Sequence, residues 1–179
     1  MGHSISGFIA RAEVMRARTA FLREARVATL EQGLAFLPAT SELYDALGGE
    51  AILEDTFFML GTGLARLGAW LSRDGETAAY VETDYFGGTG TQAVIVWRDG
   101  VIARRAEKAR LGVISSALTV YLGVEKGTEH DAFDAVGLDR HRSNDDWVER
   151  AEAESPPPVD PPPAPPAFAA TIGYSEDKE

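Results

Sequence analysis

The sequence predicts an α+β fold in which an antiparallel β-sheet packs against two or three helices. Strand-like segments over residues 77–105 are joined by glycine-containing turns, which is typical of a β-meander. Apolar residues recur with helical spacing on both sides of this meander, over residues 57–72 and 111–122. Because the best-marked strands are joined by hairpins, the sequence favours an antiparallel sheet over a doubly wound parallel sheet.

The first part of the chain is expected to alternate strands and helices. Residues 5–10 are predicted as a short strand, and residues 11–24 as a helix whose arginines lie outside its apolar stripe. We interpret these arginines, the only basic cluster of the sequence, as a solvated surface: Arg11, Arg16, Arg18, Arg23 and Arg26. Residues 27–37 are predicted as a bent strand or strand pair, and Thr40 or Ser41 caps a short helix.

The main core helix is predicted over residues 57–72. Its apolar side chains step by three or four residues along the sequence: Phe57, Leu60, Leu64, Leu67 and Leu71. Gly61 and Gly68 interrupt it, and each glycine costs about 1 kcal/mol in a helix relative to alanine. We therefore expect both glycines where the helix packs closely against the sheet.

The meander carries the strongest β signal of the chain. Residues 77–85 and 91–97 are predicted as strands that are joined by the glycine-rich loop 86–90. An Asp-Gly pair at 99–100 then indicates a tight hairpin, and a third strand follows over residues 101–105.

Composition and charge limit the classes of function. The 179-residue chain has no cysteine, which excludes disulfides, thiolate metal sites and cysteine nucleophiles. It shows no secretory leader, and no apolar run reaches the roughly 18 residues that a membrane span needs. The formal net charge is −11, and an acidic surface repels phosphate backbones and anionic lipid. We therefore expect a cytoplasmic protein that binds no nucleic acid and no membrane, whereas a basic protein partner is favoured; the oligomeric state is not indicated.

The sequence predicts one domain over residues 1–150 and a tail over residues 151–179. Eight of the nine prolines lie at positions 156–166, and proline both fixes φ and lacks a backbone donor. The tail also carries six acidic residues and one lysine, so it holds −5 of the net charge and the body holds −6. We expect this tail to be extended, acidic and disordered.

The candidate site lies on the first strand of the meander. In an extended strand, Tyr80, Glu82 and Asp84 project from one face and Tyr85 from the other, and Gln92 on the returning strand is expected near Asp84. We predict that Glu82 and Asp84 form a solvent-exposed acidic face that contacts a basic protein partner. Tyr80 or Tyr85 would then be the aromatic anchor of that interface.

An enzyme or small-ligand-binding protein is the alternative hypothesis. In that case Glu82, Asp84 and Gln92 would line a cleft beside the glycine loop, and a cavity of a few hundred Å³ around them would favour this hypothesis. The loop itself precedes a strand and lacks a lysine, which argues against a phosphate cradle. His141 lies in a polar run that we interpret as a salt-bridged cap closing onto Trp147. No cofactor and no metal site is predicted.

Several local motifs carry a resemblance to a known class of proteins. They are the segment from Tyr85 to Gln92 with Trp97 and the hairpin at 99–100, and the segment from Phe133 to Leu138 that leads to Trp147. On these residues the chain resembles small bacterial α+β proteins of uncharacterised function. In size, acidity and build it is similar to the immunity proteins of bacterial toxin systems. That likeness implies an inhibitor that binds a basic toxin, and it carries over no functional residue.

Overall fold

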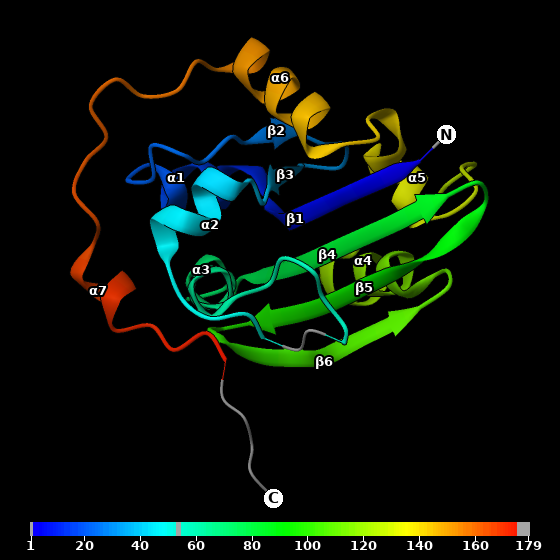
Figure 1. Cartoon of the computed structure of the whole chain (residues 1–179), viewed down its shortest axis with the longest axis horizontal. Coiled ribbons are helices and arrows are strands. Elements are labelled where there is room, and N and C mark those ends of the chain that lie inside the picture. Colours follow the sequence, from blue (N-terminus) through cyan, green and yellow to red (C-terminus); the bar gives the residue numbers. More distant parts are fainter. Residues whose placement is uncertain (1, 53–54, 175–179) are drawn as a thin grey trace, which may run out of the picture.

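The computed structural model describes residues 2–52 and 55–174. A six-stranded antiparallel sheet lies at its centre in the order β2-β3-β1-β4-β5-β6, and helices cover both faces of the sheet (Figure 1). The predicted α+β fold with an antiparallel sheet is thereby confirmed. The strands have these bounds: β1 His3–Arg11, β2 Ala28–Thr29, β3 Leu34–Pro38, β4 Thr77–Phe86, β5 Thr89–Arg98 and β6 Val101–Ala109.

The first strand occupies the middle of the sheet. β1 pairs with β4 from His3 to Ala10, whereas its pairing with β3 begins only at Gly7. Residues 5–10 are buried on both faces because helices pack above and below this central strand. The part of β1 before Gly7 therefore has one edge that β3 does not cover.

The predicted meander is confirmed as β4, β5 and β6. Both of its turns are two-residue turns, with positive φ at Gly87 and Gly88 and at Asp99 and Gly100. Positive φ at both central positions suits the right-handed twist of the paired strands, and glycine adopts it without steric cost. The first turn is tighter than the loop predicted for residues 86–90, because Phe86 already pairs with Thr89.

Four helices pack on one face of the sheet: α1 Ala12–Thr19, α2 Ser41–Leu47, α3 Thr62–Leu71 and α7 Pro166–Ala169. The core helix α3 is shorter than predicted, because Gly61 is its extended N-cap and Phe57 is buried outside it. Gly68 lies directly over Trp97 of β5, where an added Cβ would stand 2.6 Å from the indole ring. The predicted close packing at Gly68 is confirmed.

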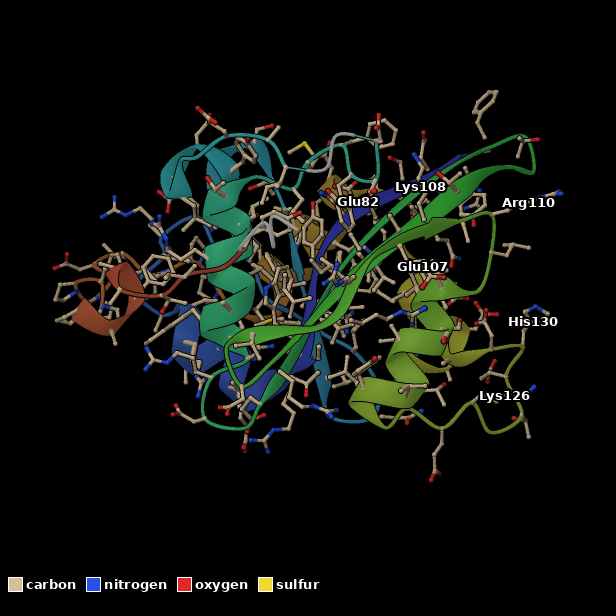
Figure 2. All side chains as sticks on the ribbon, turned by 90° about the horizontal axis from the view of Figure 1, so that it is seen from below. Glu82, Glu107, Lys108, Arg110, Lys126 and His130 are labelled. Atoms are coloured by element: carbon tan, nitrogen blue, oxygen red, sulfur yellow. The ribbon has the colours of Figure 1, made fainter. Side chains whose placement is uncertain are left out.

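Three helices and a short 3₁₀ helix cover the other face: α4 Val113–Leu122, α5 Ala132–Val136, η1 Leu138–Arg140 and α6 Asn144–Glu154. Figure 2, turned by 90° from Figure 1, shows α3 and α4 on opposite sides of the strands. The sheet is thus the middle of three layers, with more helices than the two or three predicted. Trp147 of α6 is buried in this second core, where it packs edge-on against Phe36 and His141.

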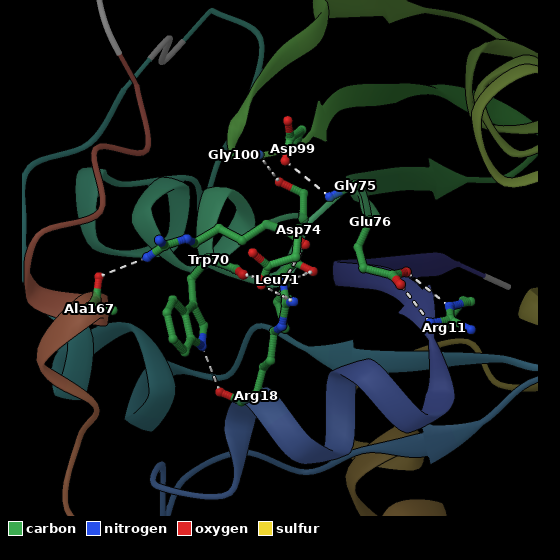
Figure 3. A network of polar contacts seen from close by, with 12 residues as sticks. Arg11, Arg18, Trp70, Leu71, Asp74, Gly75, Glu76, Asp99, Gly100 and Ala167 are labelled. Carbon is green, nitrogen blue, oxygen red and sulfur yellow. Dashed lines mark hydrogen bonds and ion pairs between the residues drawn. The ribbon is translucent and has the colours of Figure 1, made fainter.

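The arginines in and next to α1, which the sequence suggests are only a solvated surface, bind other elements of the fold, although the Arg11 side chain is still 56% exposed. Arg18 donates hydrogen bonds to the carbonyls of Trp70 and Leu71 at the end of α3 and of Arg73 just after it, and the Trp70 indole N–H donates one to the Arg18 carbonyl (Figure 3). Arg11 forms an ion pair with Glu76. These partners lie more than 50 residues away, so helical periodicity alone could not reveal them.

The C-terminal segment differs from the predicted disordered tail. Helix α6 continues across the proposed boundary at residue 150, and residues 156–165 then run as an extended, largely exposed linker (Figure 1). After the linker, Phe168 and Gly173 are buried against the body. Tyr174 also packs against the core of the body, and Arg73 donates a hydrogen bond to the Ala167 carbonyl. An average over the tail's composition hides these contacts.

Candidate functional site

A groove of about 730 Å³ opens on the surface of the described residues. It lies between the first residues of β1, the start of α2, the segment after α1, and α6. Five polar residues line it: Ser4, Ser6, Thr40, Ser41 and Asn144. Its charged lining residues are Arg23, Glu24, Arg26, Glu42, Asp145 and Glu152.

The polar lining is held in place at the uncovered edge of β1. The Ser4 N–H donates to the Arg142 carbonyl at 2.8 Å, and the Ser6 N–H donates to Asn144 Oδ1 at 2.9 Å. Asn144 Nδ2 donates in turn to Ser6 Oγ at 3.0 Å and to the Ala39 carbonyl at 3.1 Å. One asparagine thus joins α6, β1 and the segment before α2, so the groove has a rigid polar wall.

Acidic side chains outnumber basic ones around the groove. Arg26 is paired with Glu152 at 3.0 Å and also donates to the Arg23 carbonyl. Glu24, Glu42 and Asp145 make no ion pair with the described residues, and Arg23 is their only basic counterpart in the lining. The four acids and two arginines leave a net charge of −2. A concave surface with a surplus of negative charge concentrates positively charged groups.

Glu82 lies behind this groove and is not at the surface, which corrects the prediction of a wet acidic face. Its side chain is paired across the strands with Ser6 and is only 5% exposed. The carboxylate accepts the backbone N–H groups of Phe58 and Met59 at 2.6 and 2.7 Å, and the Tyr80 hydroxyl at 2.8 Å. The segment before α3 crosses this face of the sheet, and Glu82 fixes it there.

Burial also shifts the pKa values of Glu82 and Tyr80. Desolvation raises the pKa of Glu82, although its three hydrogen-bond donors favour the charged form. Desolvation raises the pKa of Tyr80 well above its ordinary value, so its hydroxyl stays protonated and donates to Glu82. Tyr80 is fully buried and is not an exposed anchor. In Figure 2, Glu82 lies among the interior side chains, whereas Arg110 and Lys126 project from the periphery.

Asp84 is exposed, as predicted for a contact residue. It pairs with Ser4 across β1 and β4, and cross-strand partners project from the same face of a sheet. Asp84 therefore lies beside the end of the groove that Ser4 lines. Of the two acids predicted on this strand, Glu82 binds the backbone of Met59 below the groove lining, and Asp84 adds a negative charge beside the rim.

The side chains of Gln92 and Tyr85 lie on the opposite face of the sheet. Gln92 is paired with Thr83 and not with Asp84, so its buried side chain turns away from the predicted acidic face. Its Oε1 accepts the N–H groups of Gly112 and Ile114 at the start of α4. The Tyr85 hydroxyl donates to the Arg110 carbonyl, and burial raises the pKa of Tyr85. The expected grouping of Glu82, Asp84 and Gln92 is therefore wrong by one residue of register.

The groove residues themselves were missed by sequence reasoning. Ser4 and Ser6 alternate with the apolar residues of β1, and that alternation is the one signal that marks a polar face there. Asn144, more than 130 residues away, has no such signal. The groove is not lined by Glu82, Asp84 or Gln92, so those three do not form the cleft that the enzyme hypothesis requires.

Within residues 2–52 and 55–174, no group of three or more His, Asp or Glu side chains is placed to hold a metal ion. No helix in that part of the chain is long and apolar enough to cross a membrane. Comparisons with protein-family models, curated proteins and solved structures return no match to this chain.

Proposed function

We propose that this protein is a protein-binding module that receives a basic segment of its partner in the acidic groove. The observation that carries the proposal is the surplus of acidic side chains above a rigid wall of hydroxyl and amide groups. Glu24, Glu42 and Asp145 are the groove contacts, and Asp84 extends them along the rim. In its narrower form, the proposal is an immunity-like inhibitor that binds a basic toxin.

The chemistry of the lining supports binding in preference to catalysis. Two of the four hydroxyl groups in the lining already accept structural hydrogen bonds: Ser6 Oγ accepts from Asn144, and Thr40 Oγ1 accepts from the Leu43 N–H. A hydroxyl nucleophile needs a base beside it. No histidine or lysine is among the residues that line the groove. The hydroxyl and carboxylate oxygens that remain are acceptors for ammonium and guanidinium groups.

The acidic groove also suits the kinetics of an inhibitor. Complementary charge at an interface mainly accelerates encounter and excludes partners of the wrong sign. The carboxylates of Glu42 and Asp145 are exposed, so they retain their hydration until a partner arrives. We therefore expect association to slow steeply as salt is added.

An octa-arginine peptide is the probe for the experiment. The groove variant carries Glu24→Gln, Glu42→Gln and Asp145→Asn. The control variant carries three substitutions outside the groove lining, Glu13→Gln, Glu125→Gln and Glu129→Gln. Each variant loses three negative charges, so the electrostatic attraction between the peptide and the whole molecule changes equally in both. We expect calorimetry at low salt to show at least about tenfold weaker binding for the groove variant, as loss of charge-assisted contacts implies, and near-parental binding for the control. Equal losses in both variants would refute the groove as the site.

A further inference from the structure

The C-terminal residues 166–174 lie on α3 in the manner of a bound peptide. Phe168 inserts between Phe21, after α1, and Trp70 of α3, with ring centroids 4.9 and 5.9 Å apart. It is buried, although the residues on either side of it are exposed. A single aromatic side chain in an aromatic pocket is a common form of peptide recognition.

A glycine five residues later makes the second contact. The Gly173 carbonyl accepts the indole N–H of the fully buried Trp97 at 2.7 Å. The backbone approaches α3 so closely that an added Cβ would lie 2.0 Å from the backbone of Ala65 and Arg66. Ile172 next to it points to solvent and is 76% exposed. The site thus selects for an aromatic side chain and for a glycine.

The linker to this segment is loosely attached. In residues 156–165, one hydrogen bond joins the linker to the body, from Arg23 to the Val159 carbonyl at 3.4 Å. Val159 is 93% exposed, and a space of about 170 Å³ remains between the first prolines and α1. Proline-rich chain without internal hydrogen bonds behaves as a semi-rigid tether, so it holds the segment near its site without fixing it there.

We propose that residues 166–174 are a tethered, reversibly docked ligand of a peptide-binding groove formed by Phe21, Trp70, Trp97 and the backbone of α3. The ligand class is a short uncharged segment with an aromatic residue and, five positions later, a glycine. Its occupant is this chain's own C-terminal segment, which closes the groove to other peptides while it is docked. The proposal is independent of the acidic groove, which lies elsewhere on the molecule.

The first test uses a fluorescent peptide of residues 164–174 and full-length protein. Phe168→Ala and Gly173→Leu each weaken the internal segment and leave the groove intact. The apparent affinity for an added peptide decreases as fewer sites are open. Both variants open more sites than the parent does, so they should bind the peptide at least about tenfold more tightly. Ile172→Ala, which alters an exposed side chain, should bind it like the parent.

Two results of the peptide experiment would overturn the proposal. One is the absence of binding to both folded variants at peptide concentrations near ~1 mM, the effective concentration typical of a short tether. The other is equal binding to the parent and to both variants, which would mean that the internal segment does not occupy the groove. A labelled peptide that carries Gly173→Leu is the specificity control and should bind no chain.

A second measurement uses only the parental protein, in case the variants fail to fold. The indole N–H of Trp97 is protected by Gly173, so its hydrogen exchange reports release of the segment. Local opening precedes global unfolding in loosely attached segments. We expect this N–H to exchange at least about 100-fold faster than the backbone amides of β5. Equal protection would show that the segment leaves only when the whole domain unfolds, and the proposal would then be wrong.

Discussion

Glu82→Gln tests the reassignment of the carboxylate from a surface contact to an internal attachment. In the parent, two carboxylate oxygens accept three donors: the N–H groups of Phe58 and Met59 and the Tyr80 hydroxyl. Glutamine keeps the shape of the side chain but replaces one oxygen with an NH₂ group. At least one backbone N–H then faces a donor instead of an acceptor.

The magnitude follows from those contacts. A hydrogen bond to a charged group contributes about 1.5–3 kcal/mol, and an unsatisfied buried donor costs about 1–3 kcal/mol. Removal of a buried charge returns part of its desolvation cost, which acts in the opposite direction. We therefore expect Glu82→Gln to lower the free energy of unfolding by about 1–3 kcal/mol. Asp84→Asn, two residues along the same strand but exposed, should change it by no more than about 0.5 kcal/mol.

Urea denaturation of both variants at several pH values is the assay. Burial raises the pKa of Glu82 in the folded protein above its ordinary value, so the folded state binds the proton more readily than the unfolded state does. Its contribution to stability is present in full below the unfolded pKa and is lost as the pH rises through the folded pKa. Glutamine does not titrate. The stability gap between parent and Glu82→Gln should therefore widen as the pH falls from 8 towards 5.

Equal stability of Glu82→Gln and Asp84→Asn would show that the Glu82 carboxylate holds nothing in place. The other contradicting outcome is a stability gap that narrows on acidification. That result would show that the three donors stabilise the charged carboxylate by more than burial destabilises it, which contradicts the raised pKa.

Three further changes probe the rest of the fold. Gly68→Leu should cost about 1–3 kcal/mol by overpacking against Trp97, measured by thermal melting; a parental melting temperature would contradict the close contact. Arg18→Ala should lower the free energy of unfolding by about 1–3 kcal/mol, since three carbonyls lose a charged donor. Asp74→Asn removes the charge that pairs with Arg18 but keeps a residue that tolerates the positive φ of this position, and it should cost under about 1 kcal/mol because the Asp74 side chain is 82% exposed. Truncation after Glu154 should cost about 1–3 kcal/mol in a urea titration, because the lost burial of Phe168 outweighs the ordering entropy that is no longer spent on the segment; an unchanged midpoint would mean that the segment does not dock.

The meander could be predicted because its information is local. Glycine pairs at 87–88 and Asp-Gly at 99–100 define two-residue turns, and the alternation of apolar residues defines the strands between them. The central position of β1 could not be predicted in the same way. Its two neighbours, β3 and β4, lie about 25 and 70 residues further along the chain, and no local signal selects them.

The site shows where strand periodicity stops being informative. Alternation along β4 correctly places Tyr80, Glu82 and Asp84 on one face, but it does not say what covers that face. The covering segment includes Phe57, which helical spacing alone places in the core helix. Alternation within one strand therefore predicts a wet carboxylate at Glu82, where the fold buries it.

The same carboxylate connects the predicted site to the groove that the sequence did not reveal. Met59, whose N–H Glu82 accepts, lines the groove, and Ser6, its cross-strand partner, forms the polar wall together with Asn144. Neutralising Glu82 should therefore disturb the groove by loosening its frame, whereas neutralising Asp84 changes only the charge at its rim. If the groove binds a basic partner, the first substitution acts on stability and dissociation, and the second acts on the salt-dependent rate of association.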